Sequence, residues 1–433
     1  MPSCRTLGAL AALLSFAAPA SLPAQSTSVA DTTTVTRFRQ AVLRASPEFA
    51  ARRAELAAAK AAARGAGAAP PLVLAAEVEE VPDGIDLGNA GALRLEVGRE
   101  WITGGRGPAR RDLARVETEE AAARLALAEQ RIGARMDRLL VAALGNGAIA
   151  ARLAAEDTLL GEAEGALRAR FASGEARYVD VLRLRTERLR VRTDLAVALT
   201  DERVHRRALL ALIGSGDSAR TLRALADSVL ATAPSTVLDH LPSSPPQVDS
   251  LVARSAAARL AEAGAARAEA TRRLRRAEAA PSLTTGLGVQ RFGAEEGGFQ
   301  VGPTVSLAVS LPFTAPGAAR ATRESADRSA EAARLESVAD LASLRAALES
   351  ARDRYEGARE RLAVFDAALL QGAQEERESA VAAYRAGELS LLELLDFERA
   401  LSRTEISRIR SRVEAAEAYA ELMSGDSGDR ETD

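Results

Sequence analysis

The sequence predicts a mainly α-helical protein with a small β part, in which short pairs of strands precede long coiled-coil helical hairpins. Composition is the first observation: 27% of the 433 residues are charged and 3% are aromatic, a balance typical of long helices rich in Ala, Glu, Arg and Leu. An internal repeat is the second, and a run of strictly alternating apolar residues is the third. Together they favour two similar halves, each with two strands and one helical hairpin.

The repeat is clearest where residues 171–182, FASGEARYVDVL, are compared with residues 384–395, YRAGELSLLELL. In both segments glycine follows an aromatic residue by three positions, glutamate comes next, and an acidic residue then stands among apolar ones. The offset of 213 residues is about half of the chain. We therefore expect a first repeat at 25–213, an inter-repeat segment at 214–247 and a second repeat at 248–424.

The N-terminus has the pattern of a secretory signal peptide, which we place at residues 1–24. Arg5 supplies the positive charge, residues 8–18 form a short apolar stretch, and small residues then offer cleavage sites. Cys4 is the one cysteine and it precedes the apolar stretch, whereas a lipoprotein signal has its cysteine after that stretch. The mature chain therefore contains no thiol for a disulfide or a metal site.

In the first repeat, a helix at 36–45 precedes a second helix that starts at Ser46-Pro47-Glu48. A β hairpin follows at about 72–101, with turn residues between its strands. Alternation places its apolar residues on one face: Leu72, Leu74, Ala76, Val78, Leu93, Leu95, Val97 and Trp101. The other face carries Glu77, Glu79, Arg94, Glu96 and Glu100.

The inter-repeat segment is rich in Gly and Pro, with a short helical run at 220–229, and is either an insertion packed on the helices or a linker. The second repeat has its hairpin at about 282–313. From Phe299 to Phe313 every odd position is apolar or Pro, and the even positions are small or polar for the most part. A surface strand of a soluble sandwich is the alternative. Residues 425–433 are polar and predict a disordered tail.

Two long helices, at about 106–171 and 317–384, follow the hairpins. Each is about 100 Å long at 1.5 Å per residue, more than three times the roughly 30 Å hydrocarbon core of a bilayer. Shorter return helices follow at about 179–213 and 389–423. A fibrous coiled coil is the alternative for such stretches.

Four strands in lipid would leave two unpaired edges, and each unpaired backbone group there costs several kcal/mol. The smallest membrane barrels have about eight strands. Two chains would supply eight, but side chains fill the bore of a barrel of that size. Three chains would give twelve strands around an aqueous passage, so a conduit favours three or more copies. Trp101 and Phe313, which end strands, are candidates for an interfacial aromatic girdle; ordinary strand-end aromatics are the alternative.

An enzyme is not expected. The chain has two histidines, His205 and His240, and none of the common metalloprotease, P-loop or nucleophile-elbow motifs. We expect no cofactor and no metal site. A net charge of −3 gives no sign of nucleic-acid binding.

The chain resembles the TolC family of outer-membrane efflux proteins in four features. These are the signal peptide, the helix start at Ser46-Pro47-Glu48, the two hairpins that open with Pro71 and Pro281, and the duplicated glycine motif. The resemblance covers nearly the whole mature chain. It implies a trimer in which a 12-stranded β-barrel in outer-membrane lipid continues into a trimeric α-barrel in the periplasm. It also implies an exit duct for efflux or type I secretion, served by a periplasmic adaptor and an inner-membrane pump of RND or ABC type. Gly104-Gly105-Arg106 resembles a turn of the heavy-metal and cation-efflux branch, which is CzcC/CusC-like.

The resemblance also implies a periplasmic gate at the helix turns. Gly174, Asp180, Tyr384 and Gly387 occupy positions of this gate, although Leu389 stands where the family has an Arg. Glu393 and Asp396 occupy two positions of an acidic ring at the entrance, which would favour cations. The alternative is that this acidic pair is a solvated helix face. We expect positive φ at Gly174 and Gly387.

The main rival is a soluble periplasmic coiled-coil protein, such as an efflux adaptor or a scaffold. An adaptor would have one helical hairpin flanked by small β domains. Two hairpins are expected here, each after a strand pair that suits lipid. Fractionation separates the two, because a salt wash releases an adaptor and leaves a channel in the outer membrane.

Overall fold

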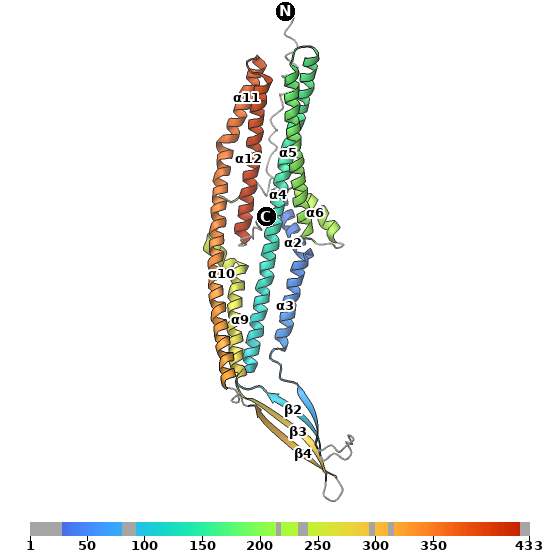
Figure 1. Cartoon of the computed structure of the whole chain (residues 1–433), viewed down its shortest axis with the longest axis vertical. Helices are drawn as coiled ribbons and strands as arrows, with labels where there is room; N and C mark the ends of the chain where they lie inside the picture. The colour runs from blue at the N-terminus through green and yellow to red at the C-terminus, as the bar shows by residue number, and fades with distance from the viewer. Residues whose placement is uncertain are drawn as a thin grey trace, which may run out of the picture. The chain divides into compact units, whose positions relative to one another are not determined.

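A computed structural model describes residues 28–79, 92–213, 218–232, 241–293, 299–310 and 316–424 (Figure 1). The elements in chain order are α2 (Ser28–Ala45), α3 (Pro47–Gly65), β1 (Leu72–Glu79), β2 (Ala92–Trp101), α4 (Arg106–Ala172), α5 (Tyr178–Ala211), α6 (Ser218–Thr232), α8 (Val248–Arg254), α9 (Ala256–Glu278), β3 (Ser282–Gly293), β4 (Phe299–Ser310), α10 (Pro316–Val364), the π-helix η2 (Phe365–Leu369), α11 (Leu370–Ala386) and α12 (Leu391–Ser424). The prediction of long helices with four strands is confirmed. The predicted signal peptide, the C-terminal tail and Phe313 lie outside the described residues.

The chain divides into two compact units, and each repeat contributes to both. The hairpin unit comprises residues 1–50, 128–255 and 344–433, and the sheet unit comprises residues 51–127 and 256–343. The long helices α4 and α10 belong partly to each unit. The sequence repeats are therefore not independent folding domains.

In the sheet unit, four antiparallel strands pair in the order β1-β2-β3-β4. Val305 on β4 pairs with Leu287 on β3, and Leu287 pairs with Val97 on β2. Because paired residues project to the same side of a sheet, this register extends the alternation across all four strands. We call the two sides the apolar face, which carries Val305, and the polar face, which carries Ser306.

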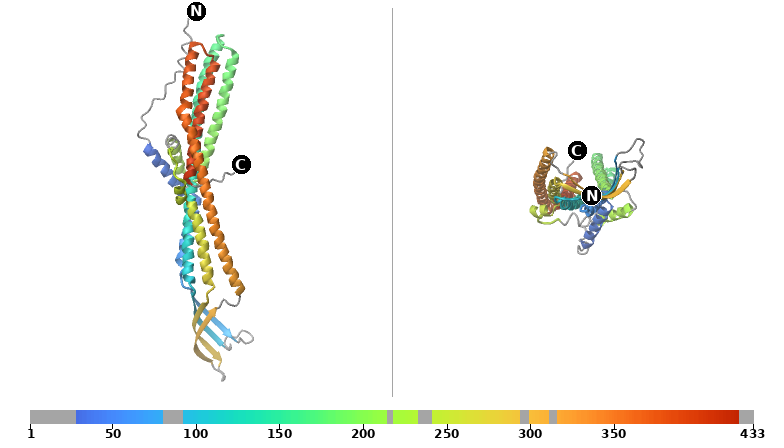
Figure 2. Two further views of the ribbon diagram at one scale, coloured as in Figure 1. Left: turned by 90° about the vertical axis from the view of Figure 1, so that its left-hand side faces the viewer. Right: turned by 90° about the horizontal axis from the view of Figure 1, so that it is seen from below.

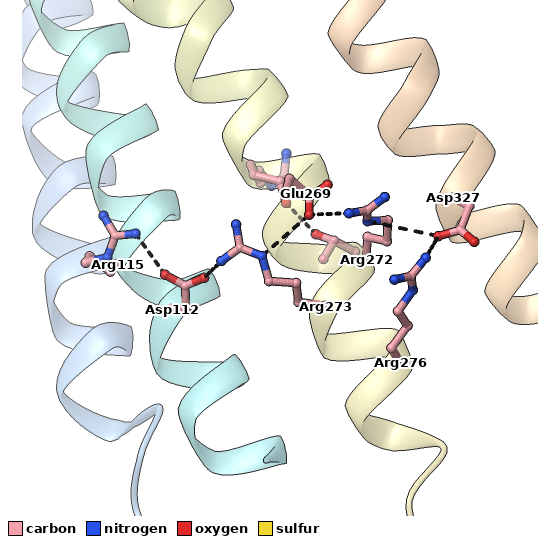
Figure 3. A network of polar contacts seen from close by, with 9 residues as sticks. Asp112, Arg115, Glu269, Arg272, Arg273, Arg276 and Asp327 are labelled. Atoms are coloured by element: carbon pink, nitrogen blue, oxygen red, sulfur yellow. Dashed lines mark hydrogen bonds and ion pairs between the residues drawn. The ribbon is translucent and has the colours of Figure 1, made fainter. Parts of the chain in front are cut away.

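Ion pairs connect the helices of the sheet unit (Figure 3). Asp112 on α4 pairs with Arg273 on α9 at 2.7 Å, and Arg276 on α9 pairs with Asp327 on α10 at 2.7 Å. Glu269 holds both Arg272 and Arg273 from within α9. An isolated exposed ion pair contributes about 0–1 kcal/mol to the free energy of unfolding. Each pair of this network therefore fixes side-chain positions between the helices but adds little stability.

The core of the hairpin unit contains fully buried side chains from α2, α4, α5 and α6, including Phe38, Met136, Leu209 and Val229. The helix in the inter-repeat segment is therefore packed and not free, because Val229 of α6 lies in this core. Of the helices in the described part of the chain, α4 has the one stretch long and apolar enough to cross a membrane, and half of that stretch is buried.

Two helical hairpins, α4–α5 and α11–α12, lie side by side in the hairpin unit (Figures 1 and 2). Leu395 of α12 belongs to the same apolar cluster as Val181 and Leu184 of α5. Arg399 of α12 pairs with Glu187 of α5 at 2.9 Å. The two hairpins thus contact each other through apolar packing and ion pairs.

The second long helical stretch is unbroken, as the sequence predicts, but it contains a π-helical segment that the sequence did not predict. This is the π-helix Phe365–Leu369, between α10 and α11. Within it, Asp366 accepts a hydrogen bond from Arg408 of α12 and lies 3.8 Å from Arg412. The composition of this segment is as helix-favouring as that of its neighbours, so nothing in the sequence marked the change.

Candidate functional site

The apolar face of the sheet is uncovered. Val305 is 79% exposed, Val301 is 71% exposed and Leu307 is 70% exposed. Large apolar side chains on all four strands share this exposure: Leu72, Leu74, Leu93, Leu95, Val97, Leu287, Val289 and Val309. Arg99 and Arg291 lie on the same side of the sheet, near its two ends. The exposed apolar surface between them marks a contact with another apolar phase or surface.

Trp101 lies at the end of the apolar face that leads into α4, and it is half-exposed. Its indole Nε1–H donates a hydrogen bond of 2.7 Å to Thr285 Oγ1. The Arg99 guanidinium carbon lies 5.2 Å from the centroid of the indole ring, a distance suited to a cation–π interaction. An apolar ring with a polar edge and a nearby cation suits a membrane–water interface. The girdle role of Trp101 remains a prediction.

The polar face carries a network that sequence reasoning missed. Arg94 pairs with Glu77 at 3.0 Å and donates hydrogen bonds to Gln290 Oε1 on the next strand. Glu96 accepts a hydrogen bond from Ser306. Glu96 reaches Ser306 across β3 because glycines of β3, which have no side chain, lie between them. A side chain at Gly286 would occupy the space of the Glu96 carboxylate.

The two predicted helix turns have the same backbone geometry. Gly174 has φ 81° and Gly387 has φ 79°, so the expectation of positive φ is confirmed. In each turn the glycine N–H donates to the carbonyl three residues earlier, that of Phe171 or Tyr384. The next N–H donates to the carbonyl five residues earlier. This is the Schellman pattern, which satisfies the last carbonyl groups of a helix.

The predicted acidic residues lie at the starts of the return helices. Asp180 is in the first turn of α5 and pairs with Arg177 at 3.1 Å. Glu393 accepts a 2.7 Å hydrogen bond from the Ser390 backbone N–H, and Ser390 Oγ accepts one from the Glu393 N–H. This is a capping box, and the Ser390 backbone N–H lowers the pKa of Glu393 below its usual range. Asp396 is exposed and pairs with Arg399 at 2.6 Å.

The structure does not bring the two predicted gate side chains together within one chain. Tyr384 packs inside its own hairpin, with Val381, Leu394 and Phe397. Leu389, at the position where an arginine was expected, packs on the same cluster. Among the described residues no hydrogen bond joins Asp180 to Tyr384.

A group of buried carboxylates between the hairpins also escaped sequence reasoning. Glu156 of α4 is buried and accepts a hydrogen bond from Ser402 of α12. Burial raises the pKa of Glu156, and the carboxylates of Glu187 and Glu398 act in the same direction. Helical spacing alone gave no indication that these acids face inward, because the sequence shows them among arginines on an ordinary charged helix.

Comparison with solved structures identifies the architecture. A membrane protein from Pseudomonas aeruginosa superposes with a TM-score of 0.75 at 19% identity, covering 90% of this chain and 92% of that one. The outer-membrane protein VceC from Vibrio cholerae gives a TM-score of 0.72 at 18% identity, with 91% and 96% covered. The chain has the TolC-type outer-membrane channel fold. No protein-family model matches the sequence, and no curated protein matches it.

The TolC-type fold does not by itself select a branch of the family. The structure of CusC gives a TM-score of 0.70 at 14% identity, with 91% of this chain and 92% of that one covered. This TM-score is close to those of the other two structures. The cation-efflux hint in Gly104-Gly105-Arg106 therefore stays a prediction.

Proposed function

We propose that this protein is an outer-membrane channel, the exit duct of a tripartite efflux or type I secretion system. One observation carries the proposal: on a TolC-type fold, a four-stranded sheet exposes an apolar face and carries charged, hydrogen-bonded residues on the other. This is the outward-apolar, inward-polar arrangement of a transmembrane barrel wall. Substrates would pass along the polar face to the exterior.

The open edges of the sheet support closure by further copies of the chain, for which we propose a homotrimer. β1 and β4 each have one partner strand, so one edge of each is unpaired. In a membrane those edges must be closed, and pairing β1 of one chain with β4 of the next in three copies gives twelve strands. The helical hairpins would then extend into the periplasm towards an adaptor and an inner-membrane pump of RND or ABC type.

The helix turns at Gly174 and Gly387 would form the periplasmic mouth, with Asp180 and Tyr384 near the gate. Glu393 and Asp396 of three chains would bring six carboxylates near one constriction. Their bonds to Ser390 and Arg399 give both residues a structural role as well. The two roles are compatible, because Glu393 remains exposed while it caps α12.

The channel proposal predicts a trimer that conducts ions. The purified mature protein in detergent should have the mass of three chains by native mass spectrometry, and it should give discrete conductance steps in a planar bilayer. The rival adaptor or scaffold would leave the membrane fraction in a salt wash. A stable monomer in a membrane-like environment, without conductance, contradicts the proposal.

The entrance ring predicts a change in ion selectivity. The double substitution Glu393→Gln, Asp396→Asn should lower the cation-to-anion permeability ratio, because it removes six negative charges from the trimer. Glutamine can still complete a capping box, so the helix start is retained. A matched control is Glu349→Gln, Glu360→Gln, which neutralises two exposed acids on α10. Reversal potentials in a salt gradient measure the ratio, and equal ratios in both double variants would leave the acids a structural role alone.

A further inference from the structure

We propose that Glu156 is a proton-binding site that couples the contact between the two helical hairpins of one chain to pH. With its proton bound, Glu156 holds α12 against α4. When the proton is released to water, the contact loosens. The site lies within one chain, so the inference depends neither on the trimer nor on the channel function.

Glu156 lies on a buried side of α4. It follows Leu153 by three residues and precedes Leu160 by four, a spacing that places the three side chains on one side of the helix. Leu153 and Leu160 belong to an apolar cluster that also contains Leu184 of α5 and Leu395 of α12. Glu156 is 8% exposed, so its carboxyl group is largely withdrawn from water.

The contact between α4 and α12 is polar at Glu156 and apolar farther from the helix turns. Ser402 of α12 is buried, and its hydroxyl donates a hydrogen bond to Glu156. Farther along, Val413 of α12 lies so close to Gly145 of α4 that a Cβ on the glycine would overlap the valine side chain. The Ser402–Glu156 hydrogen bond therefore joins the two hairpins at the part of the contact that is nearer the turns.

The buried acids that face Glu156 each have a guanidinium of their own. Glu187 of α5 and Glu398 of α12 are buried, and both repel a negative charge on Glu156. Arg399 lies 2.9 Å from Glu187, and Arg377 of α11 lies 2.7 Å from Glu398. These two acids are thus paired in their charged form.

Glu156 has a weaker partner. Arg152 lies one turn earlier on α4, with 3.9 Å between its Nη1 and Glu156 Oε2, and its Nε donates to Glu405 of α12. Among the residues that the structure describes, no other guanidinium comes within 4 Å of the Glu156 carboxylate. Glu156 is therefore the member of this buried group whose negative charge is least compensated.

These surroundings favour the protonated form of Glu156. Burial raises its pKa above the ordinary value of 4.5, and the charges of Glu187 and Glu398 act in the same direction. The Ser402 hydroxyl and the Arg152 guanidinium lower the pKa and offset these effects only in part. When the hairpins separate, the carboxyl group meets water and its pKa returns towards the ordinary value.

The sign of the pH dependence follows from this difference. A carboxyl group whose pKa is raised in the packed state stabilises that state fully below its ordinary pKa. This contribution is lost as pH rises through the raised pKa. In that step the O–H bond of the Glu156 carboxyl breaks and the proton passes to water, which leaves a buried carboxylate. The contact between the hairpins should therefore be strongest in acid and weaken as pH rises.

Glutamine reproduces the protonated state without the ability to lose the proton. A protonated carboxyl group has an acceptor oxygen for the Ser402 hydroxyl and one donor of its own, and an amide has both. Glu156→Gln should therefore retain the hairpin contact at every pH, and the wild type should lose it in part as pH rises.

Hydrogen exchange measured by mass spectrometry tests this difference in the whole mature chain, from about pH 4 to about pH 8. Peptides that contain Glu156 and Ser402 are compared between the wild type and Glu156→Gln at the same pH, because the intrinsic exchange rate also changes with pH. The ratio of the wild-type rate to the variant rate should be near one at the lowest pH. It should then rise by at most about tenfold per pH unit and level off above the raised pKa.

Helix α3, in the sheet unit, serves as an internal reference, and its exchange ratio should not change with pH. A ratio around Glu156 that stays constant with pH overturns the proposal. An equal change in α3 overturns it as well, because the effect would then not belong to the hairpin contact.

Glu417→Gln is the matched control. Glu417 is also on α12, and burial raises its pKa as well, against the charges of His205 and Arg138. It follows Ser402 by 15 residues, about 22 Å along the helix. Its substitution should leave the pH dependence around Glu156 unchanged. If Glu417→Gln removed that dependence and Glu156→Gln did not, Glu156 would not be the proton-binding site.

Infrared spectroscopy tests the proton itself, because a protonated carboxyl group and a carboxylate absorb at different frequencies. The difference between the wild-type and Glu156→Gln spectra should contain a band of the protonated carboxyl group. This band should disappear over the pH range in which the exchange ratio rises. Ser402→Ala should move both changes to higher pH, because the Ser402 hydroxyl lowers the pKa of Glu156. A band that disappears at the ordinary pKa, or a shift to lower pH in Ser402→Ala, overturns the proposal.

Discussion

Val305→Arg should destabilise the membrane-inserted protein by about 2–4 kcal/mol per chain, if Val305 lies near the middle of the bilayer. Val305, on the edge strand β4, ends a row of apolar residues that crosses the sheet through Leu287 and Val97. The sheet shields little of its side chain, so a guanidinium here would face hydrocarbon. The measurement is the free energy of unfolding by urea from lipid vesicles, with outer-membrane yield in cells as a second readout.

Ser306→Arg is the matched control, one residue along the same strand. Ser306 lies on the polar face with its hydroxyl on Glu96, so an arginine there would meet a carboxylate and water. Its cost should be well below that of Val305→Arg. Equal losses at the two positions would contradict the assignment of the faces.

Gly104→Ala should destabilise the sheet unit by about 2–5 kcal/mol. Gly104 has φ 65°, and positive φ costs a residue with a side chain about 1–2 kcal/mol. A methyl group would also overlap the Cβ of Ala280, beside the end of α9. Forcing such an overlap apart costs about a further 1–3 kcal/mol.

Gly105→Ala separates the two contributions. Gly105 has φ 78°, but a Cβ there has no atom within 4 Å. Its substitution should therefore show the backbone cost alone, about 1–2 kcal/mol. Thermal unfolding of both variants measures the difference. If Gly105→Ala were the more damaging, the close approach to Ala280 would not be the reason that Gly104 is glycine.

The sequence predicted those parts of the fold in which local pattern determines structure. Alternation along β4 placed Val305 and Ser306 on opposite faces, and the register bears this out. The glycine motif predicted turns with positive φ at Gly174 and Gly387, which the backbone shows. Both are effects of neighbouring residues on one another, and a single sequence contains them.

Interactions between distant segments could not be predicted in the same way. The bond from Ser402 to Glu156 joins residues 246 positions apart, and nothing local marks either as a partner. The π-helix at Phe365–Leu369 was missed for a different reason, since its residues favour an ordinary helix as well. The pattern Ser390-x-x-Glu393 is that of a capping box, which the structure contains. The resemblance predicted a different role for Glu393, as a residue of the entrance.

The two helix turns share a backbone but not a chemistry. Gly174 and Gly387 close their helices with the same hydrogen bonds, yet the first turn continues into an Arg177–Asp180 ion pair and the second into a Ser390–Glu393 capping box. The two copies thus agree at the glycine, where the backbone needs a positive φ, and differ in the residues that start the return helix, where either an ion pair or a capping box serves. Three assembled chains would present six tips with the same backbone shape and with two alternating sets of side chains. A binding partner would then meet sixfold pseudosymmetry in the backbone and threefold symmetry in the charges.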